Sequence, residues 1–314
     1  MKDQLLALIE KYDSIVVFGH INPDGDCFGS QVGIKEIILE NFPNKKVFIA
    51  GTGIKRFYKR LGNVSNVDAE LISKSLAIIV DCSAFNRLEV SLAANAKAHI
   101  IFDHHLPSHD TIDCPRIIDN SKIAASEIIA EWALENNLVI NKIAAEALFL
   151  GITTDSGGFK YKNTSSSTFV IASKLVATGF DFEGMYDVLH TSYEIDLKLQ
   201  GFILSHYKKT KTGFIYNIFT RNDLKKLGLE SNAAASRVNT LSNIEGYPVW
   251  GSFTEYPDGF FRVELRSKGF PIVSVALLFG GGGHANACGI TRLEHDRISE
   301  VVDAVNRHLM EIKR

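Results

Sequence analysis

Short apolar runs alternate with helical patterns along the first half of the chain. Four of these runs are rich in β-branched residues and apolar on both faces: residues 14–19, 46–50, 76–81 and 98–103. Such strands are typical of a parallel sheet covered by helices. Helical patterns lie between and after them, at residues 29–41, 54–61, 124–136, 142–151 and 166–178. The alternation of strand and helix predicts an α/β fold.

The pattern changes after about residue 190. Residues 194–209 predict one long helix, and three strands are expected after it, at 213–220, 248–256 and 260–266. The turn residues Pro257, Asp258 and Gly259 predict that the last two strands form a hairpin. Further helices are expected near 272–279 and at 296–312. We therefore expect a first domain over 1–190, a helical connector over 191–210 and a second, smaller α/β domain over 211–314.

Composition and charge exclude several classes of protein. The chain has 314 residues, of which 46% are hydrophobic and 22% charged, so a large core is expected. Its 34 Lys and Arg against 36 Asp and Glu give no overall field for long duplex nucleic acid. The N-terminal pattern predicts an amphipathic helix and not a signal peptide, and no apolar run is long enough for a membrane span. Four scattered cysteines favour reduced thiols in a cytoplasmic protein.

Acidic and histidine side chains follow the ends of three predicted strands. The carboxyl ends of parallel strands share one edge of a sheet, where the sites of such proteins form. A fourth segment, after the helix at 142–151, adds one more carboxylate. Taken singly, each of these side chains has an ordinary alternative role as a turn residue, a helix cap or a surface group. Their joint placement carries the hypothesis, and the set is His20, Asp24, Asp26, Asp81, His104 and Asp155.

Gathered carboxylates repel one another unless cations neutralise them. Aspartate oxygens with neutral imidazoles suit Mn²⁺ and, less exclusively, Mg²⁺, whereas the cysteine spacing disfavours structural zinc. Two metal ions that share a carboxylate form the machinery for attack on phosphorus. The sequence therefore predicts a two-metal phosphoesterase site at the edge of the first sheet.

A glycine run is the second unusual feature. Gly280 to Gly283 precede His284, and such a run lets a ligand approach the backbone, where successive N–H groups can converge on an anion. No Lys-Ser or Lys-Thr pair follows, so the run is not a P-loop, and a flexible connection is the alternative interpretation. Arg266 ends a predicted strand and is a candidate for a phosphate contact.

The motifs together resemble the DHH phosphoesterase family. In the first half the matching segments are residues 19–26 with Gly29 and Ser30, 81–83 with Arg87, the Asp-His-His triplet 103–105, and 151–158. The second half resembles the DHH-associated C-terminal domain at 266–267, 280–284 and 287–289. The resemblance covers nearly the whole chain. It implies a catalytic parallel-sheet domain and a substrate-binding domain that face each other across a cleft.

The resemblance also implies a role for each site residue. One metal would be held by His20, Asp24 and Asp81, and the other by Asp26, Asp81, His104 and Asp155. Asp81 would bridge them, His105 would face the scissile phosphate, and Asp103 would orient a neighbouring histidine or loop. The implied cofactor is a pair of Mn²⁺ ions, with Mg²⁺ or Co²⁺ as substitutes. The implied substrate contacts in the second domain are Arg266, Ser267, Gly281, Gly282, Gly283 and His284.

In length and arrangement the chain is most similar to the bacterial nanoRNases within this family. That similarity implies hydrolysis of short single-stranded RNA, linear dinucleotides and 3′-phosphoadenosine 5′-phosphate (PAP) to mononucleotides. A linear or cyclic diadenylate phosphodiesterase and a pyrophosphatase or exopolyphosphatase remain as alternatives. A non-enzymatic nucleotide sensor is disfavoured, because binding alone does not need six intact metal ligands. A homodimer remains open.

Overall fold

The computed structural model describes residues 2–105 and 113–312 of the chain. Its contacts divide the chain into two compact units, Met1–Thr191 and Ser192–Arg314. Residues 192–210, expected as part of a connector, are therefore grouped with the second unit. The division of the chain into a catalytic domain, a connector and a substrate-binding domain stays a prediction. Within the described ranges, no helix is both long enough and apolar enough to cross a membrane.

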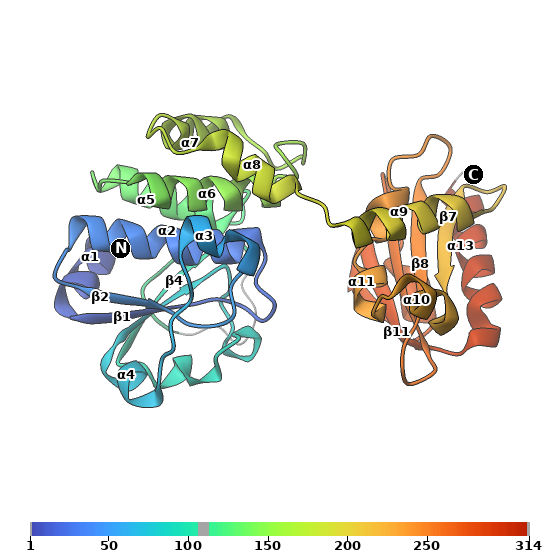
Figure 1. Ribbon diagram of the computed structural model, residues 1–314, viewed down its shortest axis with the longest axis horizontal. Coiled ribbons are helices and arrows are strands. Elements are labelled where there is room, and N and C mark those ends of the chain that lie inside the picture. The colour runs from blue at the N-terminus through green and yellow to red at the C-terminus, as the bar shows by residue number, and fades with distance from the viewer. Residues whose placement is uncertain (1, 106–112, 313–314) are drawn as a thin grey trace. The chain divides into compact units, whose positions relative to one another are not determined.

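A five-stranded parallel sheet forms the centre of the first unit, with strand order β2-β1-β3-β4-β5 (Figure 1). The four predicted strands are confirmed, and β5 is an addition. It has only three half-buried residues and gives no clear strand pattern. The bounds are β1 Ser14–Phe18, β2 Lys46–Ile49, β3 Leu76–Val80, β4 Ala98–Asp103 and β5 Arg116–Ile118.

Both faces of this sheet are buried, as the apolar runs predict. On β1, Ile15 and Val17 join one hydrophobic cluster, while Val16 and Phe18 join another on the opposite face. The first cluster includes α1 Lys2–Lys11, α2 Gly25–Asn41, α5 Ala125–Glu135 and α6 Lys142–Asp155. The remaining helices of the unit are η1 Lys55–Phe57, α3 Tyr58–Leu61, α4 Ala69–Lys74, η2 Phe85–Arg87, η3 Ser91–Asn95, α7 Ser166–Val176 and α8 Phe182–His190.

Two helices extend further toward the site than expected. Helix α2 begins at Gly25 and not at residue 29, because the Asp24 side chain accepts hydrogen bonds from the backbone N–H groups of Asp26 and Cys27. Helix α6 continues past Gly151 to Asp155. The candidate residues Asp26 and Asp155 therefore lie on the first turn of one helix and the last turn of another.

Glycines let α2 and α6 pack closely. A Cβ atom added to Gly29 would lie 2.3 Å from the backbone oxygen of Ala147 on α6. Gly25 and Gly33, one turn away on either side, would meet Thr154 and Leu148 in the same way. A larger residue at Gly29 would push the two helices apart, because the atom that it meets belongs to the backbone of α6. The close approach brings the end of α6 to the start of α2.

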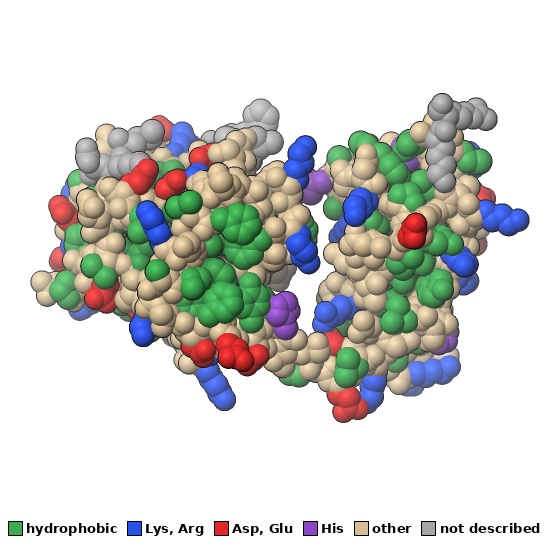
Figure 2. Space-filling model, turned by 90° about the horizontal axis from the view of Figure 1, so that it is seen from above, with side chains coloured by type: hydrophobic (Ala, Val, Ile, Leu, Met, Phe, Trp, Pro, Cys, Tyr) green, Lys and Arg blue, Asp and Glu red, His purple; other side chains and the backbone are tan. Residues whose placement is uncertain are grey.

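Apolar side chains remain exposed on α7 and α8. Figure 2 shows hydrophobic groups gathered on the face of the first unit that these helices form. Phe169, Val170 and Phe182 are 55%, 55% and 43% exposed. Among the described residues, nothing covers this surface.

The second unit contains a mixed six-stranded sheet, with strand order β10-β11-β9-β8-β7-β6. The hairpin predicted at Pro257-Asp258-Gly259 is confirmed: β8 and β9 are antiparallel, and Tyr256 N–H donates to the oxygen of Phe260. The glycine run is not a loop, because its second half forms strand β10 against β11. The bounds are β6 Lys208–Lys209, β7 Phe214–Phe219, β8 Val249–Glu255, β9 Phe261–Ser267, β10 Gly282–His284 and β11 Ala287–Leu293.

Helix α9 spans Glu194–His206 and stops earlier than the predicted residue 209. The chain becomes extended at Tyr207 because Lys208 and Lys209 pair with β7 as an edge strand. Leu199 and Ile203 of α9 are buried in one of the two hydrophobic clusters of this unit. The other helices are α10 Arg221–Leu227, α11 Ser231–Ala235, η4 Val238–Leu241, α12 Val273–Leu278, η5 His295–Arg297 and α13 Ile298–Ile312.

Candidate active site

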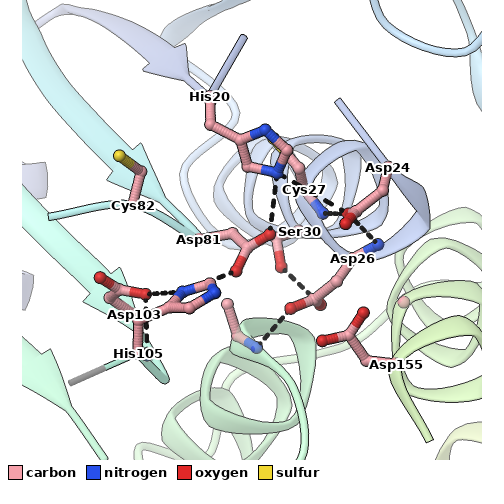
Figure 3. A network of polar contacts seen from close by, with 12 residues as sticks. His20, Asp24, Asp26, Cys27, Ser30, Asp81, Cys82, Asp103, His105 and Asp155 are labelled. Atoms are coloured by element: carbon pink, nitrogen blue, oxygen red, sulfur yellow. Dashed lines mark hydrogen bonds and ion pairs between the residues drawn. The ribbon is translucent and has the colours of Figure 1, made fainter. Parts of the chain in front are cut away.

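The carboxyl ends of β1, β3 and β4 bring the predicted site residues together (Figure 3). His20 follows β1, Asp81 follows β3, and the triplet of Asp103, His104 and His105 stands at the end of β4. Helices α2 and α6 add Asp26 and Asp155 from their facing ends. Residues far apart in the sequence therefore form one cluster, as the strand-end pattern predicts.

Asp81 lies at the centre of this cluster. Its Oδ2 atom is 3.3 Å from Nε2 of His20, and its Oδ1 atom is 3.3 Å from Nε2 of His104. The side chain is buried, and Oδ1 has no hydrogen-bond partner among the described residues. The backbone of Asp81 is left-handed, with φ +56°, a conformation that costs free energy in a non-glycine residue. The carboxylate thus presents one oxygen to each of two neighbouring groups.

Asp26 is fully buried and held by the start of α5. Its Oδ2 atom accepts a hydrogen bond from Ala125 N–H at 2.6 Å, and Oδ1 accepts one from Ser126 N–H at 2.9 Å. Ala124, at the N-cap position of α5, provides no side-chain cap, so the Asp26 carboxylate takes that place. Ser30 also donates to Asp26 Oδ1, at 3.4 Å. These supporting contacts fix the orientation of the carboxylate.

The carboxyl groups around His104 repel one another. Burial raises the pKa of Asp26 to about 7, and the Asp81 carboxylate adds to the shift. Burial raises the pKa of Asp155 to about 8, with further contributions from Asp26 and Asp81. Burial opposes ionisation of His104, but the adjoining carboxylates bring its pKa to about 9. His104 Nε2 lies 3.3 Å from Asp155 and 3.8 Å from Asp26. In the protein without cations, protons bound to Asp26, Asp155 and His104 therefore neutralise part of the negative charge of the cluster.

Asp103 and His105 form a second, supporting contact. Asp103 is buried, and its Oδ1 atom lies 2.8 Å from Nδ1 of His105 and accepts a hydrogen bond from His105 N–H. Burial alone would raise the pKa of Asp103, yet these contacts bring it below its ordinary value. The His105 side chain is 42% exposed. Asp103 thus orients a histidine that solvent or substrate can reach.

Two residues differ from the expected pattern around His20. Asp24 caps α2, its side chain is 58% exposed, and its Oδ1 atom lies 3.8 Å from Nε2 of His20. Cys27 was not expected in the site, but its sulfur, a nitrogen of His20 and an oxygen of Asp81 lie within 4.8 Å of one another. Burial raises the pKa of the Cys27 thiol to about 11. Its place one turn after Asp24 on α2 is the signal that could have found it.

The donor set fits divalent cations. Two groups, Asp26 with His104 and Asp155, and Asp81 with His104 and His105, each bring their ligand atoms within 4.8 Å of one another. Carboxylate oxygens and imidazole nitrogens suit Mn²⁺, Mg²⁺ and similar ions. Oδ1 of buried Asp81 has no hydrogen bond within the described residues, and the pKa values of Asp26 and Asp155 are raised; both observations indicate that positive charge is missing.

In the second unit, Arg266 and His284 stand in one row across three strands. Ala287 on β11 pairs with His284 of β10 on one side and with Arg266 of β9 on the other. Residues paired in this way point to the same face of a sheet. The Arg266 side chain is 25% exposed, and its neighbour on β8 is the buried Trp250. Arg266 contacts Glu264 at 2.9 Å, and its Nη1 donates to the backbone oxygen of Leu265. His284 is exposed.

The other predicted residues of the second unit have different surroundings. Ser267 is buried, and its hydroxyl donates to the oxygen of Phe270 at 2.6 Å. A Cβ atom on Gly281 would lie 2.2 Å from the oxygen of Gly289, and Gly283 has φ +131°, so both positions require glycine. An added Cβ on Gly282 would meet no atom within 4 Å. Gly282 therefore leaves open space, while its two neighbours let β10 pack on β11.

The fold and the cluster define a phosphoesterase-type site built on a parallel sheet. Sequence comparison agrees with this class: the DHH family, N-terminal domain, matches residues 14–152, and the DHHA1 domain matches residues 212–311. The chain belongs to the DHH family.

Similar proteins cover nearly the whole chain. The bifunctional oligoribonuclease and PAP phosphatase NrnA of Mycoplasma genitalium is 36% identical over 304 residues, which cover 95% of both chains. The protein of the same name from Mycoplasma pneumoniae is 36% identical and covers 96% of this chain and 94% of its own. Among solved structures, an exopolyphosphatase-related protein from Bacteroides fragilis has a TM-score of 0.85 at 26% identity. That match covers 99% of this chain and 96% of the other.

Proposed function

We propose that this protein is a two-metal phosphoesterase that hydrolyses short oligoribonucleotides, linear dinucleotides and PAP to mononucleotides. The observation that carries the proposal is the position of Asp81, whose two oxygens face His20 and His104. A carboxylate in this position can be shared by two cations, the arrangement that two-metal sites use for in-line attack on phosphorus. The names of the related proteins support the choice of substrate.

The expected ligand assignment is retained as part of the proposal. His20, Asp24 and Asp81 would hold one cation, and Asp26, Asp81, His104 and Asp155 the other. Cys27 lies beside the first group, and Asp24 stands at its edge, with Oδ1 3.8 Å from Nε2 of His20. We propose Mn²⁺ as the preferred ion, with Mg²⁺ or Co²⁺ as substitutes.

The residues of the chain then have separate tasks in hydrolysis. Bound divalent cations would neutralise the phosphate charge and lower the pKa of a water molecule. Ser30 and the N–H groups of Ala125 and Ser126 hold the Asp26 carboxylate in a fixed orientation. Asp103 orients His105, whose exposed ring is available to stabilise the phosphate or to give a proton to the leaving oxygen.

The second unit would bind the part of the substrate that does not react. Arg266 and His284 share one face of the sheet, His284 is exposed, and the uncovered position at Gly282 lets a ligand approach the backbone. A phosphate and a nucleobase are the groups that such a face can bind. Ser267, Gly281 and Gly283 would support this face through packing and hydrogen bonds.

A substrate panel tests the proposed function. The panel contains PAP, linear diadenylate, short RNA oligomers, pyrophosphate and cyclic diadenylate, each with Mn²⁺ and with excess chelator. We expect AMP from PAP and from diadenylate, loss of activity with chelator and recovery with Mn²⁺. Chelator-insensitive hydrolysis would refute the two-metal site, and turnover of pyrophosphate alone would assign the protein to the pyrophosphatase alternative.

The expected homodimer and cytoplasmic location stay predictions. The exposed apolar surface of α7 and α8 supports self-association, and the four free cysteines support a reducing compartment. Light scattering at micromolar concentration tests the first point, and a single mass of about 35 kDa would contradict it.

A further inference from the structure

An open pocket borders the candidate metal centre next to Asp155. Its volume is about 540 Å³, and His104 and Asp155 form part of its wall. The rest of the lining comes from two segments, one before α5 and one before α7: Asn120, Lys122 and Ile123, and Tyr161, Lys162 and Asn163. The size lies within the range of roughly 300–1,000 Å³ for pockets that bind small organic groups. The hydrolysis described so far uses none of the residues in these two segments.

Tyr161 presents an aromatic ring to this pocket. Its side chain is 60% exposed, and a Cβ atom on Gly157 would lie 2.6 Å from the ring. Gly157 has φ +58°, so glycine permits both the turn and the contact with the ring. Tyr161 N–H donates to the oxygen of Ser156, the residue that follows Asp155. The turn that begins directly after Asp155 therefore carries the aromatic ring.

Polar groups complete the pocket. Asn120, Lys162 and Asn163 are exposed and make no hydrogen bond or ion pair within the described part of the chain. Lys122 differs, because its amine is bound to Glu131 at 2.7 Å. Two free amides can donate to and accept from the edge of a base, and an aromatic ring can stack on its face. The combination suits a nucleobase better than a bare phosphate.

We propose that this pocket binds the nucleoside attached to the scissile phosphate, with its base stacked on Tyr161. The proposal rests on the proposed function. In that reaction a water oxygen bonds to phosphorus, the bond from phosphorus to the 3′ oxygen breaks, and the 3′ oxygen takes up a proton. The attacked phosphate stays linked through its 5′ oxygen to the downstream nucleoside, and this nucleoside occupies the pocket.

The two proposed substrates differ at this point. A 5′-phosphorylated linear diadenylate carries an adenosine on its scissile phosphate, whereas the 3′-phosphate of PAP carries no nucleoside. Both lose the same leaving group, an adenosine 5′-phosphate. Removal of the Tyr161 ring therefore weakens hydrolysis of the dinucleotide and leaves hydrolysis of PAP as an internal control.

The experiment measures kcat/KM for 5′-phosphorylated diadenylate and for PAP with saturating Mn²⁺. Tyr161→Ala is expected to lower the dinucleotide value by about tenfold to a hundredfold, the range for loss of one base–aromatic stack, and to leave the PAP value within about twofold. Tyr161→Phe keeps the ring and should keep both values. Lys162→Ala should lower only the dinucleotide value, and by less.

Phe169→Ala and Lys160→Ala are the matched controls. They alter an exposed aromatic residue and an exposed lysine outside the pocket, and should change neither value.

If Tyr161→Ala loses the same factor for both substrates, Tyr161 supports the catalytic loop and not the base. If it loses activity for neither substrate, no base stacks on Tyr161. Each of these results overturns the pocket proposal and leaves the proposed function standing. If the unaltered protein hydrolyses neither substrate, the proposed function is wrong and the pocket proposal falls with it. If Tyr161→Ala fails to fold, Tyr161→Leu keeps much of the side-chain bulk without the aromatic face and is judged by the same ratio. Fluorescence of 2-aminopurine riboside 5′-monophosphate gives a second readout, since stacking on Tyr161 should quench it and Tyr161→Leu should not.

Discussion

The carboxylates of the first unit are buried beside one another, whereas the arginine and histidine of the second unit share a sheet face on which His284 is exposed. Asp26 and Asp81 are 0% and 2% exposed, and each has another carboxylate as a neighbour. Arg266 already has Glu264 as a partner, and His284 is exposed. The first arrangement is incomplete without cations, while the second is stable as it stands. This difference is the one expected between a centre that performs chemistry and a surface that binds substrate, and substitutions in the two units test that assignment.

The largest effect is expected for Asp81→Asn. Asparagine keeps the shape and tolerates the left-handed backbone of Asp81, but it removes the charge that two cations would share. Turnover of diadenylate should fall by at least about a thousandfold, with less metal bound and the circular dichroism spectrum unchanged. Asp68→Asn, which alters the N-cap of α4, is the control and should keep full activity. Activity within tenfold of the parent, with two metals bound, would refute the bridging role.

Substitution of Arg266 or His284 in the second unit should have an intermediate effect on hydrolysis. Arg266→Ala and His284→Ala should lower kcat/KM for diadenylate by about tenfold to a hundredfold, the value of one charge-assisted hydrogen bond to phosphate. Metal content should not change, and the defect should shrink for bis-p-nitrophenyl phosphate, which has no distant phosphate. Arg262→Ala is the matched control, because Arg262 lies on the same strand but over the ring of Tyr256. If both substrates lose the same factor, the division of tasks between the units is wrong.

A smaller effect on stability is expected where α6 meets the centre. In Gly151→Ala the new Cβ would lie 2.1 Å from the Ser126 hydroxyl and 2.8 Å from Asp26 Oδ1. The free energy of unfolding should fall by about 1–3 kcal/mol, as in overpacked cores, and metal affinity should fall with it. Gly201→Ala on α9 meets nothing within 4 Å and should raise stability by up to about 1 kcal/mol. Denaturant titration of both variants measures the contrast, and equal effects would argue against close packing at the site.

The mildest prediction concerns pH. Without metal, Asp26 and Asp155 have raised pKa values of about 7 and 8, so the folded protein must ionise repelling groups as pH rises through this range. The raised pKa of His104, about 9, gives stability that is also lost on raising the pH. The free energy of unfolding of the metal-free protein should therefore fall from about pH 4, where the same carboxyls lose their protons in the unfolded chain, up to about pH 9. Saturating Mn²⁺ should reduce this dependence, because cations replace the protons. A metal-free protein that becomes more stable as pH rises would contradict the charge distribution.

The strand-end residues could be predicted from sequence because topology alone brings them to one edge. His20, Asp81 and the triplet that begins at Asp103 each stand at the end of an apolar run, and parallel pairing of the strands places these ends at one edge of the sheet. The hydrogen bonds that orient the Asp26 carboxylate could not be predicted, because they come from the backbone N–H groups of Ala125 and Ser126, which almost any residue supplies. The glycines on α2, spaced one turn apart, were a visible signal for close helix packing.

The second unit was predicted less fully. The hairpin followed from its turn residues, whereas the strand in the glycine run did not, because its pairing with β11 depends on contacts distant in sequence. Ser267 shares its segment with Arg266 but faces the opposite side of β9, where its hydroxyl is already engaged. Alternation along a strand would have separated these two neighbours. Short elements such as β5 and β6 carry too few residues to form a pattern.

The shared carboxylate is the central claim, and electron paramagnetic resonance of the Mn²⁺-loaded protein tests it most directly. Two ions that share Asp81 are close enough for exchange coupling, so a titration should reach two Mn²⁺ per chain with the spectrum of a coupled pair. Asp81→Asn should bind fewer ions or give uncoupled signals, while Asp68→Asn should match the parent. A parent that binds one Mn²⁺, or two with independent spectra, would contradict a two-metal centre bridged by Asp81.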